Sequence, residues 1–235
     1  MVADYYTLVV ALPWLHEQME KCTQLPLSRI ALEKRLSLLS DADLQLLRLA
    51  EQLYHPVAKG DTSLPDRNRV MQWQQQVDRF PSEALRANIG LRLEMQTLLA
   101  ALRYRRRPDT SAEHFYGFGR WAPWIRRHWQ EPYFGLESQV DYLEELALLF
   151  EQGRTGELQN RMDQYLWRDL LATERSHHFT LETVICFVLR WGVAERRLSG
   201  DADAALTAFE ALSGELMQSS GIQQQLEQMF EEFNA

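Results

Sequence analysis

Apolar residues recur along most of this chain at the spacing of helix faces, and the clearest run follows Ser40. Asp43 stands three residues after Ser40, an arrangement typical of a helix-capping box. Apolar residues at positions 44, 46, 47, 49, 50 and 53 then follow until Pro56. Since proline does not continue a helix, the pattern predicts a capped amphipathic helix that ends before Pro56.

Two further helices are predicted before residue 108. Residues 67–80 form a polar, glutamine-rich segment that ends at Pro81. Ser82 is a suitable N-cap for the next helix, whose apolar positions share one face until Pro108. Gly90, in the middle of that helix, costs about 1 kcal/mol relative to alanine.

The second half of the chain carries helical patterns as well. We expect helices over residues 136–150, 156–173, 180–198 and 201–212, followed by a Gln/Glu-rich tail. Turn residues at Gly153, 176–178, Gly200 and Gly214 separate them. The chain contains no sustained alternation of period two and no Asn-Gly hairpin signal. An all-α fold built of helical bundle lobes is therefore predicted.

Two apolar segments are tested against the requirements of a membrane span. Residues 5–12 are too few to cross a bilayer, and they follow Asp4, where a secretory signal would carry positive charge. Whether they form a helix or a strand stays open, because short apolar runs fit both. Residues 181–194 are interrupted by Glu182 and Arg190 and are predicted to form a buried helix. We expect a cytoplasmic protein that is peripheral to the inner membrane only through its partners.

The character of the chain changes between residues 103 and 134. Seven arginines stand there against Asp109, Glu113 and Glu131, mixed with tryptophan, tyrosine and phenylalanine. Glycines and prolines break the segment into short pieces, so we interpret it as a loop-rich junction. The predicted organisation is an N-terminal helical half at residues 1–108, a basic aromatic junction at 109–135 and a C-terminal helical half at 136–235.

The junction admits more than one interpretation. As a contact surface, it offers the residue types that dominate binding hot spots, and arginine captures carboxylates in a bidentate manner. As a structural element, it would bury its tryptophans between the halves while arginines cap helix ends. Basic grooves with stacking aromatics also bind single-stranded nucleic acid, although the acidic remainder of the chain disfavours that interpretation. The candidate partner-binding residues are Arg105, Arg106, Arg107, Arg120, Trp121, Trp124, Arg126 and Arg127.

Net charge narrows the classes of partner. The chain has a formal net charge of -8 and a pI near 5.3, which disfavours general binding to nucleic acids or anionic membranes. From Asp201 onward it contains seven carboxylates and no lysine or arginine, as is typical of a solvated helix face and tail. Since 46% of its 235 residues are hydrophobic, the chain can still bury a sizeable core.

No catalytic constellation emerges from the sequence. Cys22 and Cys186 lack a CxxC or histidine-paired spacing, so we expect reduced cysteines rather than a disulfide or a zinc site. Glu174 and His177 have the spacing of di-iron bundles, but no second Glu-x-x-His occurs, and we expect a solvated helix end. Phosphate-loop, dinucleotide, serine-hydrolase and zincin motifs do not occur. The sequence predicts no catalytic, cofactor-binding or metal-binding residues.

Four segments together carry a family resemblance: residues 5–13, Pro26-Leu27, the capping segment at 39–44 and the arginine-rich stretch at 102–107. They resemble a small uncharacterised bacterial family encoded beside V-type ATPases, which is similar to the C subunit of V/A-type ATPases. Residues 142–146 and the helix at 181–198, followed by Gly200 and a final helix, fit the same pattern.

This resemblance implies an all-helical protein that binds other subunits. The C subunit of V/A-type ATPases is a non-catalytic funnel of helical lobes, seated on the membrane ring and receiving the tip of the central shaft. The present chain is shorter than a three-lobed funnel. The resemblance therefore implies a reduced, non-catalytic subunit or an accessory factor that links shaft and ring by protein–protein contacts.

Two other classes of function stay open at this point. A cytoplasmic all-helical chaperone would bind a client peptide in an apolar groove. An enzyme with an unrecognised site would hold convergent titratable groups in a deep pocket.

Overall fold

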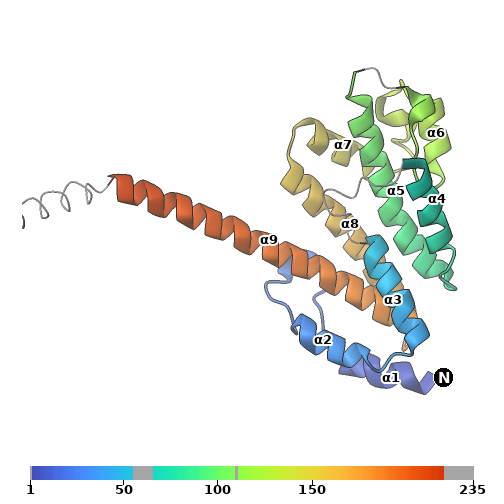
Figure 1. Cartoon of the computed structure of the whole chain (residues 1–235), viewed down its shortest axis with the longest axis vertical. Coiled ribbons are helices and arrows are strands. Elements are labelled where there is room, and N and C mark those ends of the chain that lie inside the picture. The colour runs from blue at the N-terminus through green and yellow to red at the C-terminus, as the bar shows by residue number, and fades with distance from the viewer. Residues whose placement is uncertain (1, 55–65, 109–110, 220–235) are drawn as a thin grey trace, which may run out of the picture. The chain divides into compact units, whose positions relative to one another are not determined.

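The computed structural model describes residues 2–54, 66–108 and 111–219, and most of these residues lie in helices (Figure 1). Nine α-helices and three short 3₁₀ helices lie in these residues, and no strand does. The prediction of an all-α fold is confirmed. Side chains are described for residues 5–54, 67–108 and 111–200.

The elements follow one another as α1 (Val2–Ala11), η1 (Met19–Lys21), α2 (Arg29–Leu36), α3 (Asp41–Tyr54), α4 (Asp66–Val77), α5 (Glu83–Arg105), η2 (Ala112–His114), α6 (Trp121–Arg127), η3 (Pro132–Gly135), α7 (Leu143–Glu151), α8 (Thr155–Ser176) and α9 (Leu181–Ser219). The chain divides into two compact units, Met1–Val193 and Ala194–Ala235. The boundaries expected near residues 108 and 135 both fall inside the first unit.

The N-terminal apolar segment is a helix, which the sequence left undecided. In α1, Leu8 is buried and the Tyr5 hydroxyl donates a 2.9 Å hydrogen bond to the Asp43 carboxylate of α3. The hydrogen bond from Tyr5 therefore ties α1 to α3.

Helix α3 begins and ends where the sequence predicts. The Ser40 hydroxyl oxygen accepts a hydrogen bond from the Asp43 backbone N–H at 3.2 Å and donates to the Asp43 carboxylate at 2.8 Å. The cap therefore satisfies a backbone donor that has no partner inside the helix. The helix ends at Tyr54, before Pro56, and residues 55–65 lie outside the described residues.

Helix α5 is the central element of the first unit. Ser82 caps it, as predicted, by accepting a hydrogen bond from the Leu85 N–H at 3.4 Å, and the helix ends at Arg105, shortly before Pro108. It contacts α3, α4, α6, α7 and α8, and its apolar face, with Leu85, Ile89 and Leu93, is buried. In Figure 1 α5 lies between α8 on one side and α4 and α6 on the other.

Two expectations for the second half of the chain need correction. Helix α7 begins at Leu143 rather than at residue 136, because η3 and a turn that buries Leu136 and Val140 come first. Gly200 and Gly214 do not mark turns, since α9 continues through both to Ser219. A glycine costs a helix only about 1 kcal/mol, and no proline follows to end the hydrogen-bond ladder.

Side chains from α8 and α9 anchor the irregular segment between α1 and α2. Arg190, which is 1% exposed, donates from Nη2 to the His16 carbonyl oxygen at 2.7 Å and from Nη1 to the Glu174 carboxylate at 2.7 Å. The indole N–H of Trp167 donates to the Glu17 carbonyl at 2.7 Å, and that of Trp191 donates to the Leu27 carbonyl at 3.2 Å. The segment therefore obtains its hydrogen-bond partners from helices more than a hundred residues away in sequence.

The buried-helix prediction for residues 181–194 is confirmed. Nine apolar side chains there are at most 3% exposed, those of Val184, Ile185, Cys186, Phe187, Val188, Leu189, Trp191, Val193 and Ala194. None of the described helices combines the length and the hydropathy that crossing a membrane requires.

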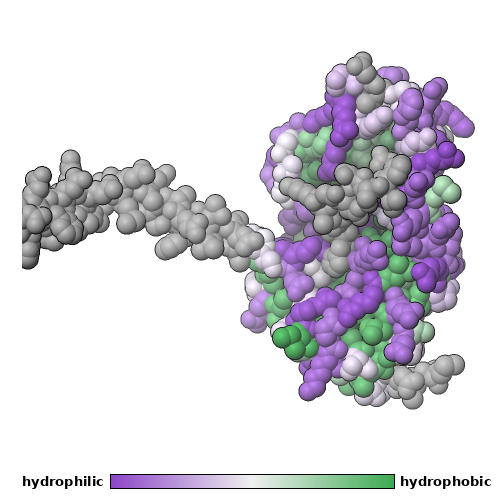
Figure 2. Space-filling model, in the orientation of Figure 1, coloured by the Kyte–Doolittle hydropathy of each residue, from purple (hydrophilic) through white to green (hydrophobic). Residues whose placement is uncertain are grey.

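The surface is largely hydrophilic, with apolar patches near the N-terminal helices. Figure 2 shows these patches mainly in its lower part, where Figure 1 places α1, α2 and α3. Exposed apolar side chains in this region include Val10, Trp14 and Ile30.

The two central leucines of α3 provide a test of its packing. Leu47 is fully buried and Leu46 is half-buried, although the two are adjacent in sequence. We expect Leu47→Ala to lower the free energy of unfolding by about 2–5 kcal/mol, because it removes methyl groups from a packed core. Leu46→Ala should cost clearly less in the same urea-unfolding measurement. Equal losses for the two variants would contradict the orientation of α3.

A buried polar network links α5, α8 and α9 and makes stability depend on pH. The Asn88 amide donates to the Asp169 carboxylate at 2.6 Å, and the Cys186 thiol lies 3.7 Å from the Asn88 amide oxygen. Burial raises the pKa of Asp169 above 3.8, although the bond from Asn88 opposes the rise.

We expect Asp169→Asn to flatten part of the dependence of stability on pH. Because the folded-state pKa of Asp169 is raised, the folded protein holds this proton more tightly than the unfolded chain does. The contribution of Asp169 to the free energy of unfolding therefore decreases as the pH rises from about its pKa in the unfolded chain to its raised pKa in the folded protein. The stability of Asp169→Asn relative to the parent protein should rise across that window, as measured by urea unfolding in a series of acidic buffers. A constant difference between the two proteins would refute the assignment.

Candidate functional site

The junction folds into short elements around an aromatic cluster. We use this name for Tyr104, Phe115, Trp129 and Phe134, whose paired ring centroids lie between 5.5 and 6.3 Å apart. Their geometries are tilted or edge-on, as aromatic pairs prefer. Phe115, Trp129 and Phe134 are buried, so this part of the junction forms a small core against the end of α5.

Two of the predicted partner-binding residues hold this cluster together. Arg105 donates from Nη1 to the carbonyl oxygens of Trp129, at 3.3 Å, and Glu131, at 2.9 Å, and its guanidinium carbon lies 4.4 Å from the Phe134 ring centroid. Burial lowers the pKa of Arg105. The Trp124 indole N–H donates to the Phe134 carbonyl at 3.0 Å. Both side chains therefore support the fold of the junction.

Arg120 and Trp121 fasten the start of α6 to α5. The Arg120 backbone N–H donates to the Glu94 carboxylate at 3.2 Å, and the Arg120 guanidinium lies 4.4 Å from the Trp121 ring centroid. Burial raises the pKa of Glu94, while the Arg120 N–H and charge and a hydrogen bond from Trp121 oppose the rise. Gly119 has a φ of +82° and lets the chain approach Glu94 closely.

The remaining predicted residues carry exposed side chains at two neighbouring helix ends. We call Arg106, Arg107, Arg126 and Arg127 the arginine surface. Arg126 and Arg127 lie in the last turn of α6, and Arg106 and Arg107 follow the last residue of α5. These two ends meet because Arg105 bonds the carbonyls just after α6. The Arg106 guanidinium also lies 4.2 Å from the Phe150 ring centroid of α7.

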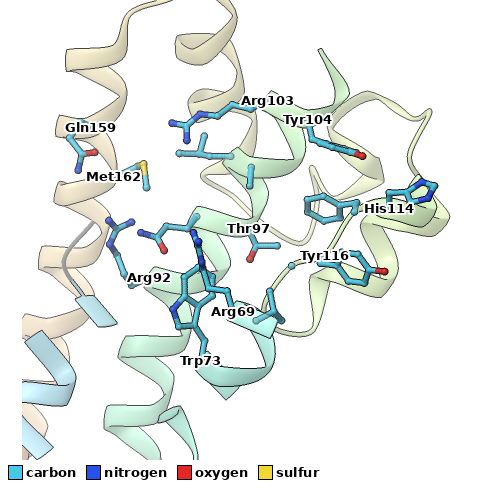
Figure 3. Close-up of a pocket in the computed structure, with 16 residues that line it drawn as sticks. Arg69, Trp73, Arg92, Thr97, Arg103, Tyr104, His114, Tyr116, Gln159 and Met162 are labelled. Carbon is cyan, nitrogen blue, oxygen red and sulfur yellow. The ribbon is translucent and has the colours of Figure 1, made fainter. Parts of the chain in front are cut away.

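A cavity of about 360 Å³ opens between α4, α5, α8 and the η2 segment. Its described lining includes Arg69 of α4, Arg92 and Arg103 of α5, and His114 of η2. Figure 3 shows Arg92 and Arg103 extending from α5 on the side that faces Gln159 and Met162 of α8, with Arg69 of α4 nearby. Among the described lining residues there are three arginines and no carboxylate.

Sequence reasoning missed this cavity. Arg92, Gln96, Leu99 and Arg103 recur at the spacing of one helix face, so α5 alone carried a signal for a basic stripe. Nothing in the local pattern connected that stripe with Arg69 or with α8, because these contacts depend on how the helices pack.

Glu174 and His177, the two residues of the Glu-x-x-His pattern, have separate structural roles. Glu174 pairs with the buried Arg190, and His177 is the C-cap of α8, with its Nδ1 3.0 Å from the Thr173 carbonyl oxygen. Among the residues that the structure describes, no three His, Cys, Asp or Glu side chains gather closely enough to hold a metal ion. Cys22 and Cys186 are both buried, and they do not form a disulfide bond with each other.

Comparison with known proteins identifies a family. A family model described as "Protein of unknown function (DUF2764)" matches residues 61–220. This span contains α4 to α9, and with them the arginine surface and the cavity, whereas α1 to α3 lie outside it. No curated protein and no solved structure matches the chain.

Two glycines with left-handed backbones test how α6 is seated on α5. A Cβ at Gly119 would clash with the Glu94 carboxylate, whereas a Cβ at Gly153, φ +71°, would meet nothing within 4 Å. We expect Gly153→Ala to cost about 1–2 kcal/mol for backbone strain alone. Gly119→Ala should cost more, because Glu94 must also move and weaken its bonds to the start of α6. Urea unfolding measures both, and similar losses would contradict the close approach at Gly119.

Proposed function

The chain belongs to the DUF2764 family, whose description assigns no activity. From the resemblance of its sequence, and from the exposed arginines of the junction, we propose that it is a non-catalytic subunit or accessory factor of a V/A-type rotary ATPase. In this role it links the central shaft and the membrane ring by protein–protein contacts. The arginine surface is the contact face for one of the other ATPase proteins.

The observation that best supports the proposal is that exposed arginines lie on a short helix held against α5. Arg126 and Arg127 lie on the short helix α6, in which Ala122 and Ile125 are buried. The aromatic cluster and Arg105 hold this helix against α5. Because the backbone beneath the arginines is fixed, little conformational entropy is lost there when a partner binds.

Charge points to an acidic partner surface. Arginine forms bidentate bonds with carboxylates and is enriched among hot-spot residues. A positive face on a chain of net charge -8 also orients the protein as it approaches a partner. Such a contact is expected to weaken as ionic strength rises.

The resemblance of the sequence to a family encoded beside V-type ATPases supplies the identity of the partner. An all-helical protein without a membrane-crossing helix among its described residues is compatible with a peripheral subunit.

We predict that charge reversal on the arginine surface releases the ATPase. Tagged protein purified from the native host should recover rotary-ATPase subunits, and Arg126→Glu with Arg127→Glu should reduce that recovery at least about tenfold, as loss of two charge-assisted contacts implies. Lys34→Glu with Arg79→Glu is the matched control, since both side chains are exposed and the change in net charge is the same.

Quantitative mass spectrometry of the recovered proteins decides between the outcomes. Recovery of ATPase subunits by the parent and the control, but not by the α6 variant, supports the proposal. Recovery of a single unrelated client would favour a chaperone instead. A parent protein that recovers no ATPase subunit, or an α6 variant that recovers as much as the parent, would rule the proposal out.

A further inference from the structure

We propose that the C-terminal part of α9, residues 198–219, is a docking helix for a basic amphipathic helix of a partner protein. The two helices would pack along one another as a coiled coil. This surface lies in the second unit, Ala194–Ala235, and does not rest on the ATPase assignment or on the arginine surface.

The docking helix has no described neighbour in its own unit. Among the residues that the structure describes there, α9 is the only secondary-structure element. From residue 198 to Ser219 the helix spans roughly 33 Å, at about 1.5 Å per residue. Helices in proteins gain most of their stability when an apolar face packs against another element. A partner helix would supply that contact.

The sequence of the docking helix carries an apolar heptad repeat. Its core positions follow one another in alternating steps of four and three residues: Leu198, Ala202, Ala205, Phe209, Leu212 and Leu216. In an α-helix this spacing places the positions in one continuous stripe, which is the pattern of a coiled-coil seam. Beyond Ser219 the sequence keeps the same register at Leu226, Phe230 and Phe233.

The size of the core residues indicates what the partner carries opposite them. Ala202 and Ala205 are small, whereas Phe209, Leu212 and Leu216 are large. Close packing across a seam pairs small residues with large ones. The partner stripe is therefore expected to carry leucine or isoleucine, which can fill the space beside the two alanines.

The charges of the docking helix select a basic partner. Asp201 and Glu215 each stand directly before a core residue, at positions that flank the seam, and Asp203 and Glu210 lie further round the helix. Residues 198–235 contain no lysine or arginine, so two copies paired along this stripe would bring carboxylates together without a positive charge. Because flanking charges decide partner choice in coiled coils, a helix with lysine or arginine beside its apolar stripe is the complementary occupant.

Fluorescence anisotropy with the full chain tests the proposal. The probe is a labelled peptide about four heptads long, with leucine and isoleucine at its core positions and lysine at the flanking ones. We expect a one-to-one complex that weakens as ionic strength rises. A peptide with glutamate in place of lysine, and one with the lysines kept but the core residues scrambled, should each bind at least about tenfold more weakly, because they lose charge complementarity and the seam respectively.

Variants of the docking helix assign the binding to its apolar stripe. Phe209→Ala with Leu212→Ala should weaken binding of the lysine peptide at least about tenfold, since large core residues are removed. Alanine is the best helix former, so the helix itself is retained, and circular dichroism checks this. Thr207→Ala with Gln218→Ala is the matched control, because both positions lie outside the heptad core and neither pair changes the net charge. The control should bind as the parent does.

Several results would overturn the proposal. These are failure of the lysine peptide to bind, equal binding of the glutamate or the scrambled peptide, and equal weakening by the two alanine pairs. Sedimentation of the parent as a dimer that Phe209→Ala with Leu212→Ala dissociates would make a second copy the occupant and would also overturn it. Arg126→Glu with Arg127→Glu should leave peptide binding unchanged, so failure of the ATPase assignment and failure of this one are separable.

Discussion

The fold of the first unit depends on hydrogen bonds that long side chains of α8 and α9 donate to the irregular backbone between α1 and α2. Between α1 and α2 only one short 3₁₀ turn forms, so much of this segment must find hydrogen-bond partners elsewhere. Arg190, Trp167 and Trp191 donate to its carbonyl groups. A buried carbonyl left without a donor costs about 1–3 kcal/mol, so these bonds tie the position of α1 and α2 to the core. Glu174 balances the charge of Arg190 and is thereby unavailable for the metal chemistry that its spacing from His177 suggested.

Helix α5 connects the two candidate sites. On one side Glu94 holds the start of α6, and Arg105 holds the segment after it, which places the arginine surface. On another side Arg92 and Arg103 face the cavity. Tyr104 belongs to both, since its ring packs in the aromatic cluster and also lines the cavity. A change in the packing of the junction would therefore alter the shape of the cavity.

Electrostatics distinguishes the two sites although both are built from arginines. At the arginine surface the side chains are exposed, so water and salt screen their charges. In the cavity Arg92 is buried, and a buried charge is much less screened.

The sequence by itself determined the helical class and the boundaries of α3 and α5, because caps and prolines act over a few residues. The caps at Ser40 and Ser82 were predictable for this reason, and the buried stretch in α9 was predictable from its apolar residues. The turn predicted at Gly200 was wrong, because one glycine is too weak to end a helix that other residues support. Only the tertiary structure showed that residues 2–11 form a helix that contacts α3. It also showed that Arg105 and Trp124 support the fold of the junction, whereas Arg126 and Arg127 are exposed. The grouping of Arg69, Arg92 and Gln159 around one cavity depends on the tertiary structure as well. These outcomes rest on contacts between residues far apart in the chain, and helix periodicity tells which face of a helix is apolar but not which other helix will cover it.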